Sequence, residues 1–244
     1  MTSEPRTQTS RHGSRGISKA LCLFLLLSVN SWFFLSNAYA QETITVAVAS
    51  SLYPMMQEQT AEFEQQHHVT IRLVPGSTGR LYNQIIQGAP FDLFIAADSD
   101  RPALLAKQGR VVELYTLGHG YVGLLAGNRV LEDMASLTNP AIRHIVIANP
   151  NVAPFGRASK AALKQHGLWT RLQPKFVYAQ NAMQAAMMVN KGLVDAGFIP
   201  VAFKHGAVAE IDYTAVVLVD RPMAHQWLKS VVFPQPEQLV LRKP

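Results

Sequence analysis

Short apolar runs rich in β-branched residues alternate with longer amphipathic stretches along most of this chain, which limits the folds open to it. Strands are predicted at residues 43–49, 69–74, 92–96, 121–126, 144–148, 175–178, 196–199 and 215–219. Helices are predicted between them at 52–66, 80–87, 157–166 and 183–191. Such alternation is typical of mostly parallel sheets covered by helices. The sequence therefore predicts an α/β fold.

No internal repeat, low-complexity tract or Pro/Ser-rich linker divides residues 41–244. We therefore expect two lobes joined by extended crossings, near 114–120 and 215–219, rather than two independent domains. The first lobe is predicted at 41–117, with 217–244 returning to it, and the second at 118–216. Ligands of such sheets gather beyond the carboxyl ends of the strands, where loops lead into helices.

The first 40 residues have the three parts of a secretory signal peptide. Four basic residues precede a mostly apolar stretch at 20–35, and the Ala-Tyr-Ala sequence at 38–40 has the small-x-small pattern of a cleavage site. A membrane-spanning helix usually needs ~20 apolar residues, and this stretch is shorter and interrupted by polar residues. Cleavage after Ala40 is therefore favoured over an uncleaved anchor, and we expect a periplasmic protein.

Charge and cysteine content narrow the functions open to the exported part. The whole chain has 22 Lys and Arg and 16 Asp and Glu residues, of which the first 40 residues hold four and one, so residues 41–244 carry a net charge of +3. This mild, dispersed charge does not indicate a nucleic-acid partner. The single cysteine, Cys22, lies in the leader, which excludes disulfides, thiolate metal sites and a cysteine nucleophile in the exported part.

Four loops place small or hydroxyl residues at the start of a predicted helix, at 49–51, 76–79, 153–156 and 180–182. A helix N-terminus has unsatisfied N–H donors and a partial positive charge, so it can bind an oxyanion without Lys or Arg. Ser51 could equally be an ordinary helix cap, and 154–156 alone a simple turn. Ser77 and Thr78 are a stronger signal, because two hydroxyls lie between glycines that allow a ligand close to the backbone. If these loops converge, the protein is an anion receptor.

Catalytic and metal-binding motifs are weak by comparison. A hydrolase using Ser51 is an alternative, but no G-x-S-x-G motif surrounds this serine. Asp92, Asp98 and Asp100 could suggest a divalent metal, although the position of Asp92 between apolar strand residues favours a structural hydrogen-bonding role. We therefore expect a binding protein rather than an enzyme.

Three segments resemble the periplasmic molybdate-binding protein family: Val46-Ala47-Val48-Ala49-Ser50-Ser51-Leu52, Gly76-Ser77-Thr78-Gly79-Arg80-Leu81, and residues 88–98, which read Gly-Ala-Pro-Phe-Asp-Leu-Phe-Ile-Ala-Ala-Asp. The resemblance implies a two-lobed type II periplasmic binding protein fold, which closes on molybdate or tungstate and delivers it to the membrane permease of an ABC importer. It also implies a monomer with no cofactor, in which the protein contacts only the oxo groups and not the metal atom.

Carried over by position, the resemblance implies ligand hydroxyls on Ser51 and on Thr78 beside Ser77, and backbone N–H contacts from Phe155 and Ala182. The chain departs from the family pattern at Pro200, where many members have a ligand tyrosine, and in a shorter segment after Asp220. Either fewer donors hold the anion, or the ligand is a different one, such as sulfate, phosphate or a small organic anion.

Overall fold

The computed structural model describes residues 41–127, 129–202, 204, 206–231 and 240–241. Residues 42–244 form one compact unit, and the predicted signal peptide at 1–40 lies outside the described residues. Across the described part of the chain, every helix is too short or too polar to span a membrane.

One mixed sheet runs through the compact unit, in the order β2-β1-β3-β9-β4-β8-β6-β7. Its strands are β1 (Thr43–Ala49), β2 (Thr70–Gly76), β3 (Leu93–Ala96), β4 (Glu113–Ala126), β6 (Ile145–Ala148), β7 (Phe176–Ala179), β8 (Ala196–Val201) and β9 (Ala207–Val217). Two short strands, β5 (Arg129–Val130) and β10 (Val240–Leu241), pair with β4. Strands β2, β1 and β3 are parallel to one another, as are β7, β6 and β8. The predicted parallel sheets are therefore confirmed.

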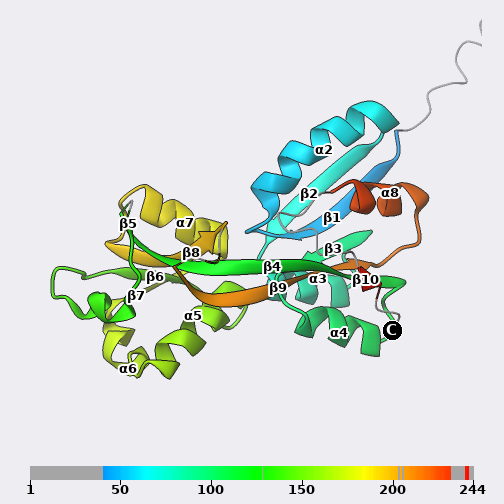
Figure 1. Ribbon diagram of the computed structural model, residues 1–244. Helices are drawn as coiled ribbons and strands as arrows, with labels where there is room; N and C mark the ends of the chain where they lie inside the picture. Colours follow the sequence, from blue (N-terminus) through cyan, green and yellow to red (C-terminus); the bar gives the residue numbers. More distant parts are fainter. Residues whose placement is uncertain (1–40, 128, 203, 205, 232–239, 242–244) are drawn as a thin grey trace, which may run out of the picture. The chain divides into compact units, whose positions relative to one another are not determined.

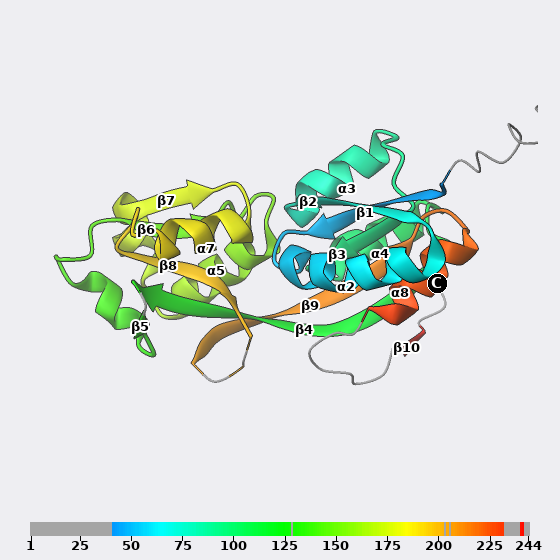
Figure 2. The same cartoon turned by 90° about the horizontal axis from the view of Figure 1, so that it is seen from above.

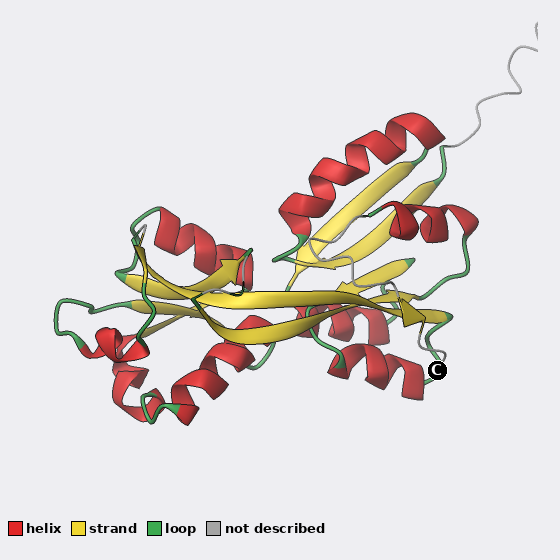
Figure 3. Ribbon diagram, in the orientation of Figure 1, coloured by secondary structure: helices red, strands yellow, loops and turns green. Residues whose placement is uncertain are grey.

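The long antiparallel strands β4 and β9 connect these two parallel sets, and Figure 1 shows one lobe at each end of the pair. The first lobe holds α2 (Tyr53–His67), α3 (Thr78–Ile86), α4 (Asp100–Lys107) and α8 (Pro222–Ser230). The second lobe holds α5 (Pro154–Gln165), α6 (Trp169–Leu172) and α7 (Ala182–Asn190), with 3-10 turns η1 (Met134–Thr138) and η2 (Gln173–Lys175). Figures 2 and 3 show helices on both faces of the sheet in each lobe.

Several helices and strands differ from the sequence prediction. Helices α3, α5 and α7 begin one to three residues earlier than predicted, so the small and hydroxyl residues of the loops lie inside their first turns. Strand β9 begins at Ala207 rather than residue 215, because the residues before 215 also pair along β4. Helices α4, α6 and α8 were not predicted. The predicted lobe boundaries stay a prediction, and they fall within β4 and β9.

Buried apolar side chains fill the space between the sheet and its helices. Phe94 in the first lobe and Phe198 in the second are almost completely buried, and each such side chain stabilises the fold by roughly 1.5–3 kcal/mol. Trp227 on α8 is also fully buried, and its Nε1–H donates to Thr60 Oγ1 on α2 at 3.2 Å. Helix α8 is thereby fixed to the first lobe.

Candidate functional site

The five residues predicted to contact a ligand, Ser51, Ser77, Thr78, Phe155 and Ala182, lie around one small cavity. The cavity is very small, because the space in it that is open to the centre of a water-sized sphere is about 10 Å³, far below the roughly 300–1,000 Å³ of pockets that bind drug-sized molecules. It is lined by Ala49, Ser50, Ser51, Gly76, Ser77, Thr78, Ala97, Ala153, Pro154, Phe155 and Ala182. The structure therefore brings the four predicted loops together around one very small cavity.

Four helices begin at this cavity because each follows a parallel strand whose carboxyl end reaches it. Helices α2 and α3 follow β1 and β2 in the first lobe, and α5 and α7 follow β6 and β7 in the second. Thr78 and Ala182 are the first residues of α3 and α7, and Phe155 is the second of α5. The N–H groups of these positions have no acceptor within their own helices. Their dipoles therefore favour negative charge in the cavity from both sides.

The hydroxyl groups of Ser77 and Thr78 add possible donors to the cavity. Ser77 is 3% exposed, and its Oγ is buried without a hydrogen-bond partner among the described residues. Thr78 Oγ1 accepts a hydrogen bond from the N–H of Ala97 at 3.0 Å. Its own proton is therefore available to another acceptor. A buried hydroxyl without a partner costs about 1–3 kcal/mol, so Ser77 leaves a polar group in the lining unsatisfied by the described residues.

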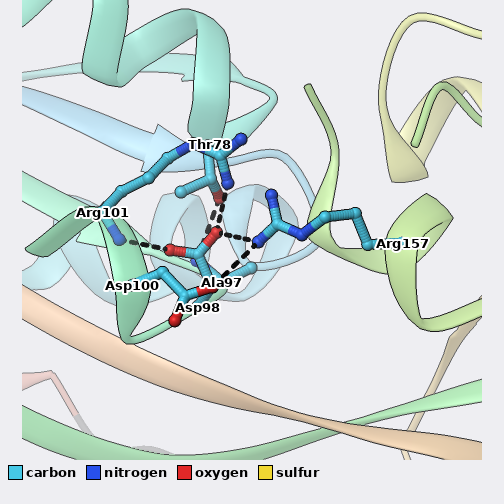
Figure 4. Close-up of polar contacts among 6 residues, drawn as sticks. All are labelled: Thr78, Ala97, Asp98, Asp100, Arg101 and Arg157. Atoms are coloured by element: carbon cyan, nitrogen blue, oxygen red, sulfur yellow. Dashed lines mark hydrogen bonds and ion pairs between the residues drawn. The ribbon is translucent and has the colours of Figure 1, made fainter. Parts of the chain in front are cut away.

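None of the described residues that line the cavity is charged, and the acidic side chain that follows Ala97 is paired with two arginines. Asp98 follows Ala97, and its Oδ2 lies 2.5 Å from Arg101 Nη1 and 2.7 Å from Arg157 Nη2. Figure 4 shows both guanidinium groups directed at this carboxylate, beside the contact of Thr78 with Ala97. An anion in the cavity would therefore meet neutral donors, and the carboxylate of Asp98, outside the lining, is already paired.

The two lobes are in contact around the cavity. The N–H of Gly79 donates to the carbonyl of Val152 at 2.8 Å, and Arg80 Nη1 donates to Gln180 Oε1 at 3.0 Å. The ion pair of Arg157 on α5 with Asp98 also crosses from one lobe to the other. Donors from both lobes are thus held within reach of a single ion.

Three features of the site were not selected from the sequence. Ala97 lines the cavity from the end of β3, and its position after a third parallel strand was an available signal. Ser50 lies in a predicted loop, and its Oγ accepts a long contact from the N–H of Met183 at 3.5 Å. The hydroxyl of Tyr213 donates to Ser51 Oγ at 3.2 Å. No local signal marks this tyrosine, because 162 positions separate the two residues.

The remaining sequence hypotheses concern the role of Asp92, a divalent metal site, a hydrolase using Ser51, and Pro200. Asp92 Oδ2 accepts from the N–H of Thr45 at 2.7 Å, which is the structural role expected of it. The described residues hold no cluster of three or more His, Cys, Asp or Glu side chains suited to a metal ion. Burial raises the pKa of Tyr213 to about 12, so the partner of Ser51 is a poor general base. Pro200 pairs with Val122 between β8 and β4 and is not among the lining residues.

Comparison with known proteins gives a consistent set of relatives. The model of the bacterial extracellular solute-binding protein family matches residues 44–222. The molybdate-binding protein of Azotobacter vinelandii is 31% identical over 179 residues, which are 72% of this chain and 71% of that protein. The solved structure of a periplasmic molybdate-binding protein from the same organism has a TM-score of 0.66 at 24% identity and covers 77% of this chain and 90% of its own.

A second solved structure, the sulfate-binding protein of Mycobacterium tuberculosis H37Rv, has a TM-score of 0.61 at 14% identity, with 79% of this chain and 82% of that chain covered. At these identities, both solved structures are evidence of the fold. The predicted fold class, a two-lobed type II periplasmic binding protein, is thereby confirmed.

Proposed function

We propose that this chain, which belongs to the bacterial extracellular solute-binding protein family, captures a small tetrahedral oxyanion, with molybdate or tungstate as the preferred ligand. Ser77 carries the proposal: its hydroxyl is buried without a partner, and the residue lines a cavity where four helices begin. A tetrahedral oxyanion offers four acceptor oxygens, which the hydroxyls and N–H groups of both lobes can satisfy at once.

The proposed ligand contacts are the hydroxyls of Ser51, Ser77 and Thr78 and the backbone N–H groups of Phe155 and Ala182. All five residues line the same cavity. The protein would contact only the oxo groups of the ion, with no direct bond to the metal atom and no further cofactor. The molybdate-binding protein of A. vinelandii, at 31% identity, supports molybdate as the first candidate.

Sulfate is the main alternative ligand, because the sulfate-binding protein of M. tuberculosis shares this fold and Pro200 contributes no hydroxyl. Molybdate and tungstate have nearly the same size and are both larger than sulfate and phosphate. The size of the cavity and the number of its donors would therefore decide among them, since each donor that the wrong anion leaves unpaired costs about 1–3 kcal/mol.

Calorimetric titration with molybdate, tungstate, sulfate and phosphate tests this function. We expect tight, one-to-one binding of molybdate and tungstate and much weaker binding of the other two. Tight binding of sulfate with molybdate ignored would replace the proposed ligand but keep the anion receptor. Heats of dilution alone for all four anions would refute the function.

The same proposal places the protein in the periplasm, exported through the predicted signal peptide, as a monomer that delivers the anion to the permease of an ABC importer. Nucleic acid is not an expected partner, because the net charge of residues 41–244 is low. Mass analysis of the exported protein would test cleavage after Ala40, and sedimentation would test the monomer.

A further inference from the structure

Tyr213 is a buried tyrosine whose hydroxyl group reaches the candidate site from the strand that connects the two lobes. It lies on β9, is 7% exposed, and donates to Ser51 Oγ at 3.2 Å. Tyr213 is not among the residues that line the cavity. Its contact with the site is therefore made through the side chain of Ser51.

The ring of Tyr213 is held in place by the facing strand. A Cβ atom built on Gly120 would lie 2.6 Å from the Cε2, Cζ and hydroxyl oxygen atoms of Tyr213. Two residues earlier on β4, Gly118 pairs with Tyr213 and has a φ of 124°, at a register shift between Thr116 and Gly118. The absence of a side chain at Gly120 gives the ring room to lie against β4, which fixes where its hydroxyl points.

The hydrogen bond from Tyr213 determines whether the Ser51 hydroxyl can donate its own proton to a ligand. A serine hydroxyl has one proton to donate and two lone pairs that accept. When Ser51 Oγ accepts from Tyr213, its own proton is available to the cavity that Ser51 lines. Because burial raises the pKa of Tyr213 to about 12, the tyrosine remains a donor throughout the neutral and mildly alkaline range.

We propose that Tyr213 is a positioning residue for the anion, which holds the Ser51 hydroxyl as a donor toward the cavity without itself contacting the ligand. This inference rests on the proposed anion-binding function, and it adds a residue of the connecting strand to the machinery of the site. Gly120 supports the same hydrogen bond, because it provides the space that the tyrosine ring needs.

A double-mutant cycle tests the inference, with molybdate as the titrant. Tyr213→Phe keeps the ring but removes the hydroxyl, and we expect molybdate affinity to fall about threefold to tenfold, as for the loss of one neutral hydrogen bond. Ser51→Ala should cost more, because it removes the proposed ligand contact itself. In the Ser51→Ala background, Tyr213→Phe should have no further effect, since its partner is already absent.

Two further variants separate positioning from folding. Tyr115→Phe is the matched control, because Tyr115 is also a buried tyrosine of the connecting strands and donates to Glu113 instead. It should leave molybdate affinity unchanged. Gly120→Ala keeps the Tyr213 hydroxyl but displaces the ring. It should weaken molybdate binding when Ser51 is present and have no further effect in the Ser51→Ala variant.

Failure of the inference differs from failure of the proposed function. If the wild-type protein binds molybdate and Ser51→Ala weakens it, the inference is overturned when Tyr213→Phe leaves affinity unchanged. It is equally overturned when the loss caused by Tyr213→Phe is the same with and without Ser51. If the wild-type protein binds none of the four oxyanions, the proposed function is refuted and this inference with it.

Discussion

At the scale of single residues, removal of the Ser77 hydroxyl should affect ligand binding but not the stability of the ligand-free protein. It is buried without a partner among the described residues, so its removal should not destabilise the ligand-free protein. If it donates to the anion, Ser77→Ala should lower molybdate affinity by about tenfold or more, the cost of a hydrogen bond to a charged group. Thermal unfolding without ligand and calorimetry with molybdate measure the two effects.

Thr60 provides the control for Ser77. It is also buried, but its Oγ1 accepts from Trp227 in the core between α2 and α8. Thr60→Val should therefore lower the free energy of unfolding by about 1–3 kcal/mol, because it leaves the indole N–H unpaired, and should not change affinity. A Ser77→Ala protein that loses stability and binds molybdate as tightly as the wild type would identify Ser77 as a structural residue.

At the scale of the helix, the start of α5 depends on Gly156. A Cβ atom at this position would lie 1.9 Å from the carbonyl oxygen of Ala148, at the end of β6. Gly156→Ala therefore requires the backbone of α5 to move away from β6, and the N–H of Phe155 moves with it. We expect a loss of about 1–3 kcal/mol or more in the free energy of unfolding and a molybdate affinity reduced at least tenfold.

Ala161 in the same helix separates these two effects. It is exposed on α5, so Ala161→Gly should cost about 1 kcal/mol of stability through helix propensity alone and leave affinity unchanged. Chemical denaturation and calorimetry on both variants provide the comparison. Unchanged affinity in folded Gly156→Ala would show that the start of α5 does not position a ligand contact.

At the scale of the whole compact unit, the ion pair of Arg157 with Asp98 links the two lobes beside the cavity. The pair is 2.7 Å long, and the Asp98 side chain is only 10% exposed. Arg157→Gln should favour separation of the lobes and weaken molybdate binding by about tenfold, although Arg157 does not line the cavity. Solution scattering should show that the variant needs more molybdate than the wild type to reach its most compact state.

Arg221 is the control for Arg157, because its ion pair with Asp92, at 3.3 Å, lies within the first lobe. Arg221→Gln should leave both the molybdate affinity and the compaction unchanged. Equal effects of the two arginine variants on binding would mean that loss of charge, rather than loss of the link between lobes, is responsible. Identical scattering with and without molybdate would contradict closure in general.

The sequence by itself determined the parallel strands, the four helices α2, α3, α5 and α7, and the loops at which a ligand would be bound. These features have local causes, because hydrophobic periodicity and residues typical of helix starts act over a few positions. Ser51, Ser77 and Thr78 were accessible in this way. Phe155 and Ala182 followed from the family resemblance, since a backbone N–H contact requires no particular side chain.

Only the tertiary structure determined which residues support the proposed ligand contacts from outside the cavity. Tyr213 meets Ser51 across 162 positions, and Arg157 meets Asp98 across 59. Neither pair has a signature in its own neighbourhood, because each depends on how β9 and α5 pack against the first lobe. The unpartnered state of the Ser77 hydroxyl is of the same kind, since it is defined by every group that surrounds it in the folded chain.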